Sequence, residues 1–188
     1  MEAILKQEII SNKTACRAIG VAVFVILTSL GAFVRIPLPF SPVPLTLQTF
    51  FVLLSGAFLG GNLGAVAQMS YIFLGLSGLP IFTGAGSGLL YLAGPTGGYL
   101  LGFVLASLFT ARFIKFAGRN LYSVLAIMVI ADLLLLASGV IWLKILFGWP
   151  LSKLLFAGFL PFLPGDLLKA GAAAIIYLRL KPRLKEVF

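Results

Sequence analysis

The sequence predicts an all-α integral membrane protein built as a bundle of six transmembrane helices. Hydrophobic residues make up 61% of the 188 residues and charged residues only 10%, whereas soluble domains carry about 25% charged residues. Apolar stretches alternate with turns rich in proline and glycine along the whole chain. A chain this apolar cannot present a water-facing surface, so we expect a single membrane domain over residues 1–188.

Two elements are expected at the N-terminus. Residues 3–12 place apolar side chains opposite charged ones, which predicts a short interfacial helix, and the apolar run 15–34 predicts the first span. This span carries Ala15, Ala18 and Ala22, and small residues at such spacing let another helix approach closely. Two interpretations remain open for them: packing inside this chain, or a docking face for a second membrane protein.

The remaining five spans follow in order. They are predicted over residues 45–59, 63–79, 99–116, 121–143 and 151–180. The first two are shorter than the usual span of about 20 residues, so we expect the protein or a locally thin membrane to accommodate them. Pro161 and Pro164 predict a break in the last span, after which a helix restarts. Asp132, the one charge in its span, is expected to face the bundle interior and to contact Ser or Thr rather than a ligand.

The lysine and arginine residues set the orientation. Ten of the fourteen gather at the N-terminus, between the fourth and fifth spans and at the C-terminus, three lie on the other side, and Lys169 lies within the membrane. Cytoplasmic loops carry the excess of positive charge, so both termini are predicted to be cytoplasmic.

Three irregular stretches then fall on the outer side. Residues 35–44 contain four prolines, which predicts an ordered loop. The glycine-rich residues 82–98 form either a flexible loop or a cap over a site, and the apolar residues 89–92 favour the cap. Asp166 and Lys169 share one face of the restarted helix, and charges at this depth are costly unless they are paired or meet something polar. Together these stretches predict an outward-facing ligand site.

The composition also excludes several functions. The chain has no histidine, one cysteine and five carboxylates, which argues against a metal site and against histidine-based catalysis. The glycine-rich stretch matches neither a P-loop nor a dinucleotide fingerprint. The positive charges lie at the ends of apolar segments, as a membrane rather than a nucleic acid requires. We therefore predict neither catalytic residues nor metal ligands.

Four motifs resemble those of one transporter family. They are PVPLTLQTF at 42–50, GLPIFTG at 78–84, GPTGGYLLGF at 94–103 and LPFLPGDLLKA at 160–170. In order and spacing they resemble the BioY family, the biotin-binding S components of energy-coupling-factor (ECF) vitamin transporters, over nearly the whole chain. The resemblance implies capture of biotin outside the cell. The loops and charges described above agree with a site on the outer side, but they do not by themselves identify biotin as the ligand.

A site that binds biotin needs hydrogen-bond acceptors for the ureido N–H groups and donors for the carbonyl and carboxylate oxygens. It also needs apolar walls for the bicyclic ring. Asp166 can accept and Lys169 can donate; the alternative is a purely structural pair facing a water cavity. Four further side chains are candidates to bond or stack with the ligand: Gln48, Tyr91, Thr96 and Tyr99. Backbone N–H groups at Gly84 and Gly86 could hold the carboxylate. Which group meets which end of biotin stays open.

The chain has no Walker motif, so it needs partners for energy. The resemblance implies a transmembrane coupling subunit that docks on Ala15, Ala18 and Ala22, and two ATPase subunits that alone use ATP. It also implies no cofactor in this chain and a place in the lipid of the prokaryotic plasma membrane. The alternatives are a membrane-embedded transferase and a stand-alone biotin facilitator.

Overall fold

The protein is described here by a computed structural model over residues 13–184, so the predicted interfacial helix at residues 3–12 lies outside the described residues. The long helices are α2 (Lys13–Phe33), α3 (Gln48–Leu59), α4 (Leu63–Leu76), α6 (Gly97–Phe113), α7 (Leu121–Phe147) and α9 (Leu163–Leu184). The short elements are β1 (Arg35–Ile36), β2 (Leu45–Thr46), α5 (Leu89–Leu92), the 3-10 turn η1 (Ile114–Ala117) and α8 (Leu151–Gly158).

The helices differ in their capacity to cross a membrane. Within residues 13–184, three segments are long and apolar enough by length and composition, namely Lys13–Phe33, Gly97–Ala117 and Leu121–Phe147. Helices α8 and α9 form a fourth candidate if the pair, bent by 47°, counts as one span, while α3 and α4 are shorter apolar helices. Three or four crossings are thus supported, and six crossings with two cytoplasmic termini stay a prediction.

Local sequence signals account for the ends of the later helices. Asn120 caps α7, since its side chain accepts hydrogen bonds from the backbone N–H groups of Tyr122 and Ser123. Gly148 ends α7 in the left-handed conformation with φ 64°, which glycine adopts without steric cost. The break predicted near Pro161 and Pro164 falls between α8 and α9. Pro164 lies in the first turn of α9, where backbone N–H groups have no acceptor within the helix, so the missing N–H of proline costs no hydrogen bond.

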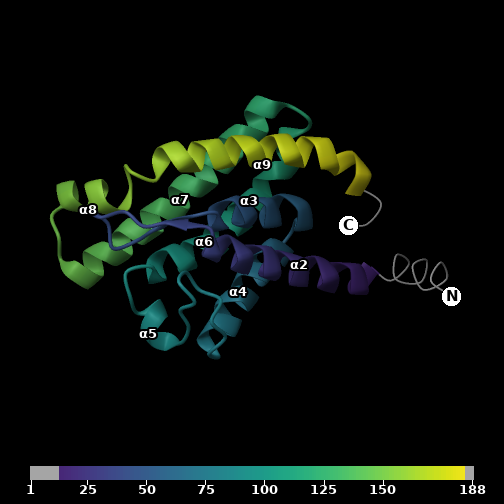
Figure 1. Ribbon diagram of the computed structural model, residues 1–188. Helices are drawn as coiled ribbons and strands as arrows, with labels where there is room; N and C mark the ends of the chain where they lie inside the picture. The colour runs from purple at the N-terminus through teal and green to yellow at the C-terminus, as the bar shows by residue number, and fades with distance from the viewer. Residues whose placement is uncertain (1–12, 185–188) are drawn as a thin grey trace.

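Helix α3 is the centre of the bundle. It packs against α2, α4, α6 and α9, and α6 in turn packs against α4 and α7. Figure 1 shows α9 and α2 running on either side of α3, with the start of α2 and the end of α9 at the same end of the molecule. The opposite end holds α8, the short strands and the loop that contains α5 (Figure 1). The irregular elements therefore gather at one end of the bundle.

The proline-rich loop is closed by two short strands. Strands β1 and β2 pair antiparallel, with Arg35 opposite Thr46 and Ile36 opposite Leu45. The pairing ends before Pro37, as expected for a residue without a backbone N–H. The loop therefore returns the chain to the start of α3, so that Thr46 and Gln48 lie at this end of the bundle.

The glycine-rich loop is anchored by one aromatic side chain. Phe82 is completely buried, stacks on Tyr91 at 4.9 Å between ring centroids and fills the space beside Gly75, where any side chain would collide with its ring. By contrast, Leu89 and Leu90 are 72% and 90% exposed. The expectation that the apolar residues 89–92 cover a site is therefore wrong for these two leucines, because the short helix α5 turns them outward.

Asp132 is buried in α7, as expected for a charge in an apolar span. Its Oδ1 atom has no hydrogen-bond partner, so the expected contact with Ser or Thr is not made by that atom. The carboxyl group lies close enough to Asp166 and Lys169 to interact with both electrostatically. Asp132 therefore lies near the ion pair at the start of α9, although it does not line the pocket described next.

Candidate ligand-binding site

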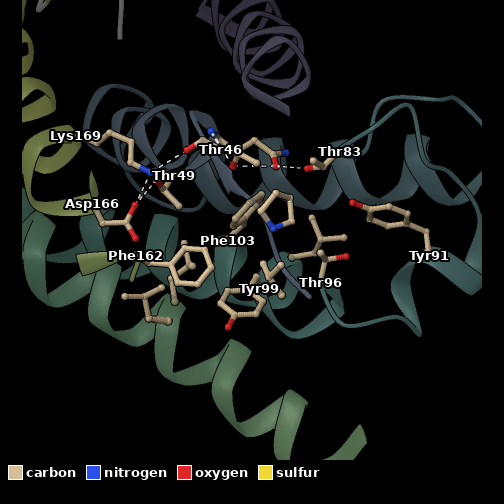
Figure 2. Close-up of a pocket in the computed structure, with 16 residues that line it drawn as sticks. Thr46, Thr49, Thr83, Tyr91, Thr96, Tyr99, Phe103, Phe162, Asp166 and Lys169 are labelled. Carbon is tan, nitrogen blue, oxygen red and sulfur yellow. Dashed lines mark hydrogen bonds and ion pairs between the residues drawn. The ribbon is translucent and has the colours of Figure 1, made fainter. Parts of the chain in front are cut away.

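A pocket lies at the irregular end of the bundle, between the strands, α3, the glycine-rich loop, α6, α7 and α9. Figure 2 shows its lining side chains pointing toward one another from these elements. The polar and aromatic lining residues are Thr46, Gln48, Thr49, Thr83, Tyr91, Thr96, Tyr99, Asp166 and Lys169. The apolar ones are Val43, Pro44, Leu100, Phe103, Leu135, Leu136 and Phe162.

The free space in the pocket is small. Its free volume is about 40 Å³, which is enough for a few water molecules and well below the roughly 300 Å³ of the smaller ligand pockets. A bicyclic ligand would therefore enter only if lining side chains or the loop that carries Tyr91 move aside. The chemistry of the walls, rather than the size of the space, is what indicates the kind of ligand.

One wall carries an ion pair at the start of α9. Asp166, 2% exposed, pairs with Lys169 through Oδ1, and the same oxygen accepts a hydrogen bond from Thr49 Oγ1 at 3.1 Å. Lys169 Nζ also donates to the backbone carbonyl of Thr46 at 2.8 Å. The N-terminal turn of a helix further favours a carboxylate. These contacts hold both charges in place across α3 and α9 (Figure 2).

The second carboxylate oxygen of Asp166 is different. Oδ2 is buried and has no hydrogen-bond partner within the described part of the protein. A buried acceptor of this kind is costly unless a donor reaches it. Since Asp166 lines the pocket, Oδ2 is suited to accept a hydrogen bond from an N–H or O–H group of a ligand.

The adjoining part of the pocket, which shares Thr46 with the ion pair, is organised around Gln48. Its Nε2 group donates to the Tyr71 hydroxyl at 2.7 Å, and its Oε1 atom accepts from Thr83 at 3.1 Å and from Thr46 at 3.3 Å. The Tyr71 hydroxyl in turn donates to the Ile81 carbonyl at 3.1 Å. This network ties α3 and α4 to the glycine-rich loop.

Aromatic rings supply much of the remaining surface. The Tyr99 hydroxyl donates to the Gly158 carbonyl at 2.6 Å, so this residue offers its ring rather than its hydroxyl to the pocket. Phe162 packs beside Tyr99 with ring centroids 6.0 Å apart. Tyr91 reaches the pocket from the far side (Figure 2), and its ring stacks on that of Phe82. These rings could enclose an apolar ligand body beside the two polar parts of the pocket.

Most of the site residues expected from the sequence meet in this pocket. Asp166, Lys169, Gln48, Tyr91, Thr96 and Tyr99 all line it. Gly84 and Gly86 do not line it. The Gly86 carbonyl accepts a hydrogen bond from the Phe82 backbone N–H, and the Arg35 guanidinium occupies the space beside Gly84. These two glycines shape the turn of the loop, where Gly84 has a φ of 75°.

Several residues that line the pocket were not among the ligand-binding residues expected from the sequence. Thr49 and Thr83 bond the two central side chains, and Phe103 and Phe162 form apolar walls. Thr46 also bonds both parts of the site, through its hydroxyl to Gln48 and through its carbonyl to Lys169. The threonines and the two phenylalanines all lie in the four family-like motifs, which were the available signal; apart from that position, nothing in the sequence separates the phenylalanines from core residues.

The small residues of α2 lie away from the pocket. Ala18 and Ala22 are exposed and Ala15 is half-buried, whereas Gly20 and Phe24 on the same helix are buried. Internal packing of Ala18 and Ala22 within this chain is therefore the weaker of the two interpretations. In the described residues, no group of three or more His, Cys, Asp or Glu side chains could hold a metal ion.

Fold and pocket together define a class: a multi-pass helical membrane protein that encloses a small pocket with one unsatisfied carboxylate oxygen. Comparison with known proteins narrows this class. The "BioY family" model matches residues 6–186. A "Probable biotin transporter BioY" of Pyrococcus horikoshii is 41% identical over 86% of this chain and 93% of the relative, and a "Biotin transporter BioY" of Thermotoga maritima is 40% identical over 87% and 94%.

A solved structure agrees with these relatives. The crystal structure of "the S-component for biotin from an ECF-type ABC transporter" superposes with a TM-score of 0.85 at 28% identity, covering 91% of this chain and 93% of that one. The chain belongs to the BioY family. Its family is one of transport proteins, which confirms the prediction that it is not an enzyme.

Proposed function

We propose that this protein is the substrate-binding S component of an ECF-type ABC transporter and that it captures biotin outside the cell. The observation that carries the proposal is the free Oδ2 atom of buried Asp166 in a chain similar to an S component for biotin. The ureido ring of biotin carries two N–H donors, and a carboxylate oxygen is the stronger kind of acceptor for them. Aromatic walls then suit the apolar part of the bicyclic ring.

Lys169 has two roles in this proposal. It balances the charge of Asp166 within the membrane, where an unpaired carboxylate would be costly. An ammonium group has three protons, and two of them are used on Asp166 and on the Thr46 carbonyl. The third remains for an oxygen of the ligand.

The proposed placement in the membrane follows from the charges. Helix α9 begins with Asp166 in its first turn and carries Arg179 and Lys181 in its final turns. The start of α2 and the end of α9 lie at the same end of the molecule (Figure 1), so the excess of positive charge supports cytoplasmic termini in the plasma membrane. The pocket, at the opposite end, would then open to the outside.

The energy for uptake would come from partner subunits, since the sequence has no motif for binding ATP. The exposed Ala18 and Ala22 on α2 offer a smooth surface on which a transmembrane coupling subunit could pack closely. Two ATPase subunits would drive that coupling subunit, and this chain itself would need no cofactor.

The proposal is tested by equilibrium binding of radiolabelled biotin to the purified protein. We expect saturable binding, weakened in Asp166→Asn by roughly 1.5–3 kcal/mol, or about 10- to 150-fold, because a charged acceptor is lost. Asp132→Asn, which removes a nearby buried carboxylate that does not line the pocket, measures how much of the loss comes from local charge alone, and we expect a smaller loss of affinity than for Asp166→Asn. Absence of binding by the wild type, or equal affinities for wild type and folded Asp166→Asn, would contradict the proposal.

A further inference from the structure

We infer that Tyr71 is a positioning residue for ligand binding: its hydroxyl fixes the side-chain amide of Gln48 so that the pocket wall around it consists of hydrogen-bond acceptors. Tyr71 lies in α4, is completely buried and does not line the pocket. The inference rests on the proposed function, because it concerns how this pocket recognises its ligand.

The direction of each hydrogen bond at Tyr71 follows from its partners. The Ile81 carbonyl can only accept, so the single proton of the Tyr71 hydroxyl, 3.1 Å away, is directed to it. The hydroxyl oxygen must then accept the second hydrogen bond, which comes from Gln48 at 2.7 Å. The donor facing Tyr71 is therefore Nε2 of Gln48, and Oε1 lies on the other side of the amide.

The opposite orientation of the amide would leave a backbone group without its partner. If Oε1 of Gln48 faced Tyr71, the hydroxyl proton would be drawn to it and away from the Ile81 carbonyl. In the described part of the chain no other donor reaches that carbonyl. Ile81 is only partly buried, but a carbonyl there loses its hydrogen bond if the hydroxyl turns away, so the bond from Tyr71 to Ile81 favours one of the two amide orientations.

The orientation of the amide determines what the pocket offers a ligand. Thr46 and Thr83 both donate their hydroxyl protons to Oε1 of Gln48. Each hydroxyl has only one proton, so toward the pocket these two threonines can offer only oxygen lone pairs. One lone pair of Thr46 already accepts a hydrogen bond from the Gln48 backbone N–H at 3.4 Å, which leaves Thr83 with more free acceptor capacity. The wall therefore suits a ligand group that carries N–H donors and disfavours a carboxylate.

The Tyr71 ring is held independently of its hydroxyl. It lies edge-on to Phe82, with centroids 5.5 Å apart, and stacks with Phe103 at 6.4 Å. Both contacts are preserved in Tyr71→Phe, which removes the hydroxyl and little else. The variant thus separates the hydrogen-bond chain from the packing of α4 against the glycine-rich loop.

The test is biotin binding by the intact protein in a double-mutant cycle. We expect Tyr71→Phe to weaken binding roughly three- to tenfold, the range of one neutral hydrogen bond. In the background of Gln48→Ala, adding Tyr71→Phe should change the affinity by less than about twofold, because the amide that it orients is absent. Biotin-induced thermal stabilisation gives the same comparison if a variant is less stable.

Ser138→Ala is the control for a structural effect. Ser138 also donates to a backbone carbonyl, that of Gly98 at 2.7 Å, but does not line the pocket, so we expect its affinity for biotin to match the wild type. An affinity of Tyr71→Phe equal to the wild type, or effects of Tyr71→Phe and Gln48→Ala that multiply, overturns the inference alone. A wild type that does not bind biotin overturns the proposed function instead.

Discussion

The pocket and the α2 surface are built in opposite ways. The pocket joins residues that are distant in sequence, as in the bond between Thr49 and Asp166, which are 117 residues apart, and its polar groups are buried. The α2 surface comes from one helix, and its small residues Ala18 and Ala22 are exposed. A buried polar site recognises a ligand by the direction of its hydrogen bonds, whereas a smooth helix face recognises a partner by close approach.

This contrast implies that the two surfaces can be disabled separately. Changes on α2 should stop uptake without weakening biotin binding, and changes in the pocket should weaken binding without affecting assembly with a partner. The following variants test that separation, beginning with the largest expected effect.

Ala18→Trp or Ala22→Trp should abolish biotin uptake by cells that contain the coupling subunits. A large side chain on this face keeps a partner helix at a distance, while the pocket lies at the other end of the bundle. Uptake of radiolabelled biotin, co-purification of the coupling subunit and binding by the isolated protein are measured together. Ala126→Trp is the control, because Ala126 is an exposed alanine of α7.

Two results would contradict the separation of surfaces. Normal uptake by both Ala18→Trp and Ala22→Trp would mean that the partner docks elsewhere. Loss of biotin binding in the isolated variants would mean that these alanines pack within the bundle after all.

Lys169→Met should weaken biotin binding roughly 10- to 150-fold, because it removes a charged donor and leaves Asp166 without its counter-charge. It should also lower thermal stability, since removing one member of a buried pair leaves an uncompensated charge. Adding Asp166→Asn should then restore part of the stability but not the binding. Lys144→Met, which removes an exposed lysine bonded to the Trp149 carbonyl, is the control.

The outcome for stability decides between two roles of the pair. If Lys169→Met binds biotin as tightly as the wild type, the lysine is purely structural. If it instead loses binding with unchanged stability, the ammonium acts mainly on the ligand. Co-purification with the coupling subunit should be unchanged in either case, as the comparison of the two surfaces requires.

The sequence was sufficient for features that depend on neighbours in the chain. The break near Pro161 follows from the geometry of proline, and the pairing of Asp166 with Lys169 from their spacing on one helix turn. The length of α3 did not settle the number of crossings, because a short apolar helix can lie inside protein or span a thin membrane.

Features that depend on long-range contacts could not be obtained in this way. Tyr71 looks like any aromatic residue of an apolar helix until its hydroxyl is seen between Gln48 and Ile81. Glycine content indicated backbone freedom at Gly84 and Gly86 but not which way the freed N–H groups would point. A single sequence specifies the types of groups available for binding, and tertiary contacts specify their directions.

The smallest expected effect concerns how the glycine-rich loop is seated over the pocket. A methyl group at Gly75 would overlap the buried Phe82 ring, so Gly75→Ala should displace the ring and destabilise the protein by about 1–3 kcal/mol. Thr83 and Tyr91 move with that loop, so biotin binding should weaken modestly. At Gly171 in α9 a methyl group would meet nothing within 4 Å, and Gly171→Ala should stabilise the helix by about 0.5–1 kcal/mol.

Thermal unfolding with and without biotin measures both effects of this pair of variants. If Phe82 holds the glycine-rich loop in place, Gly75→Ala lowers the melting temperature and reduces the stabilisation by biotin. Gly171→Ala instead raises the melting temperature and leaves the stabilisation by biotin unchanged. A Gly75→Ala protein with lower stability but full biotin affinity would show that the loop contributes to the fold and not to the pocket. Recognition would then depend on Asp166, Lys169 and Gln48, which belong to helices α3 and α9.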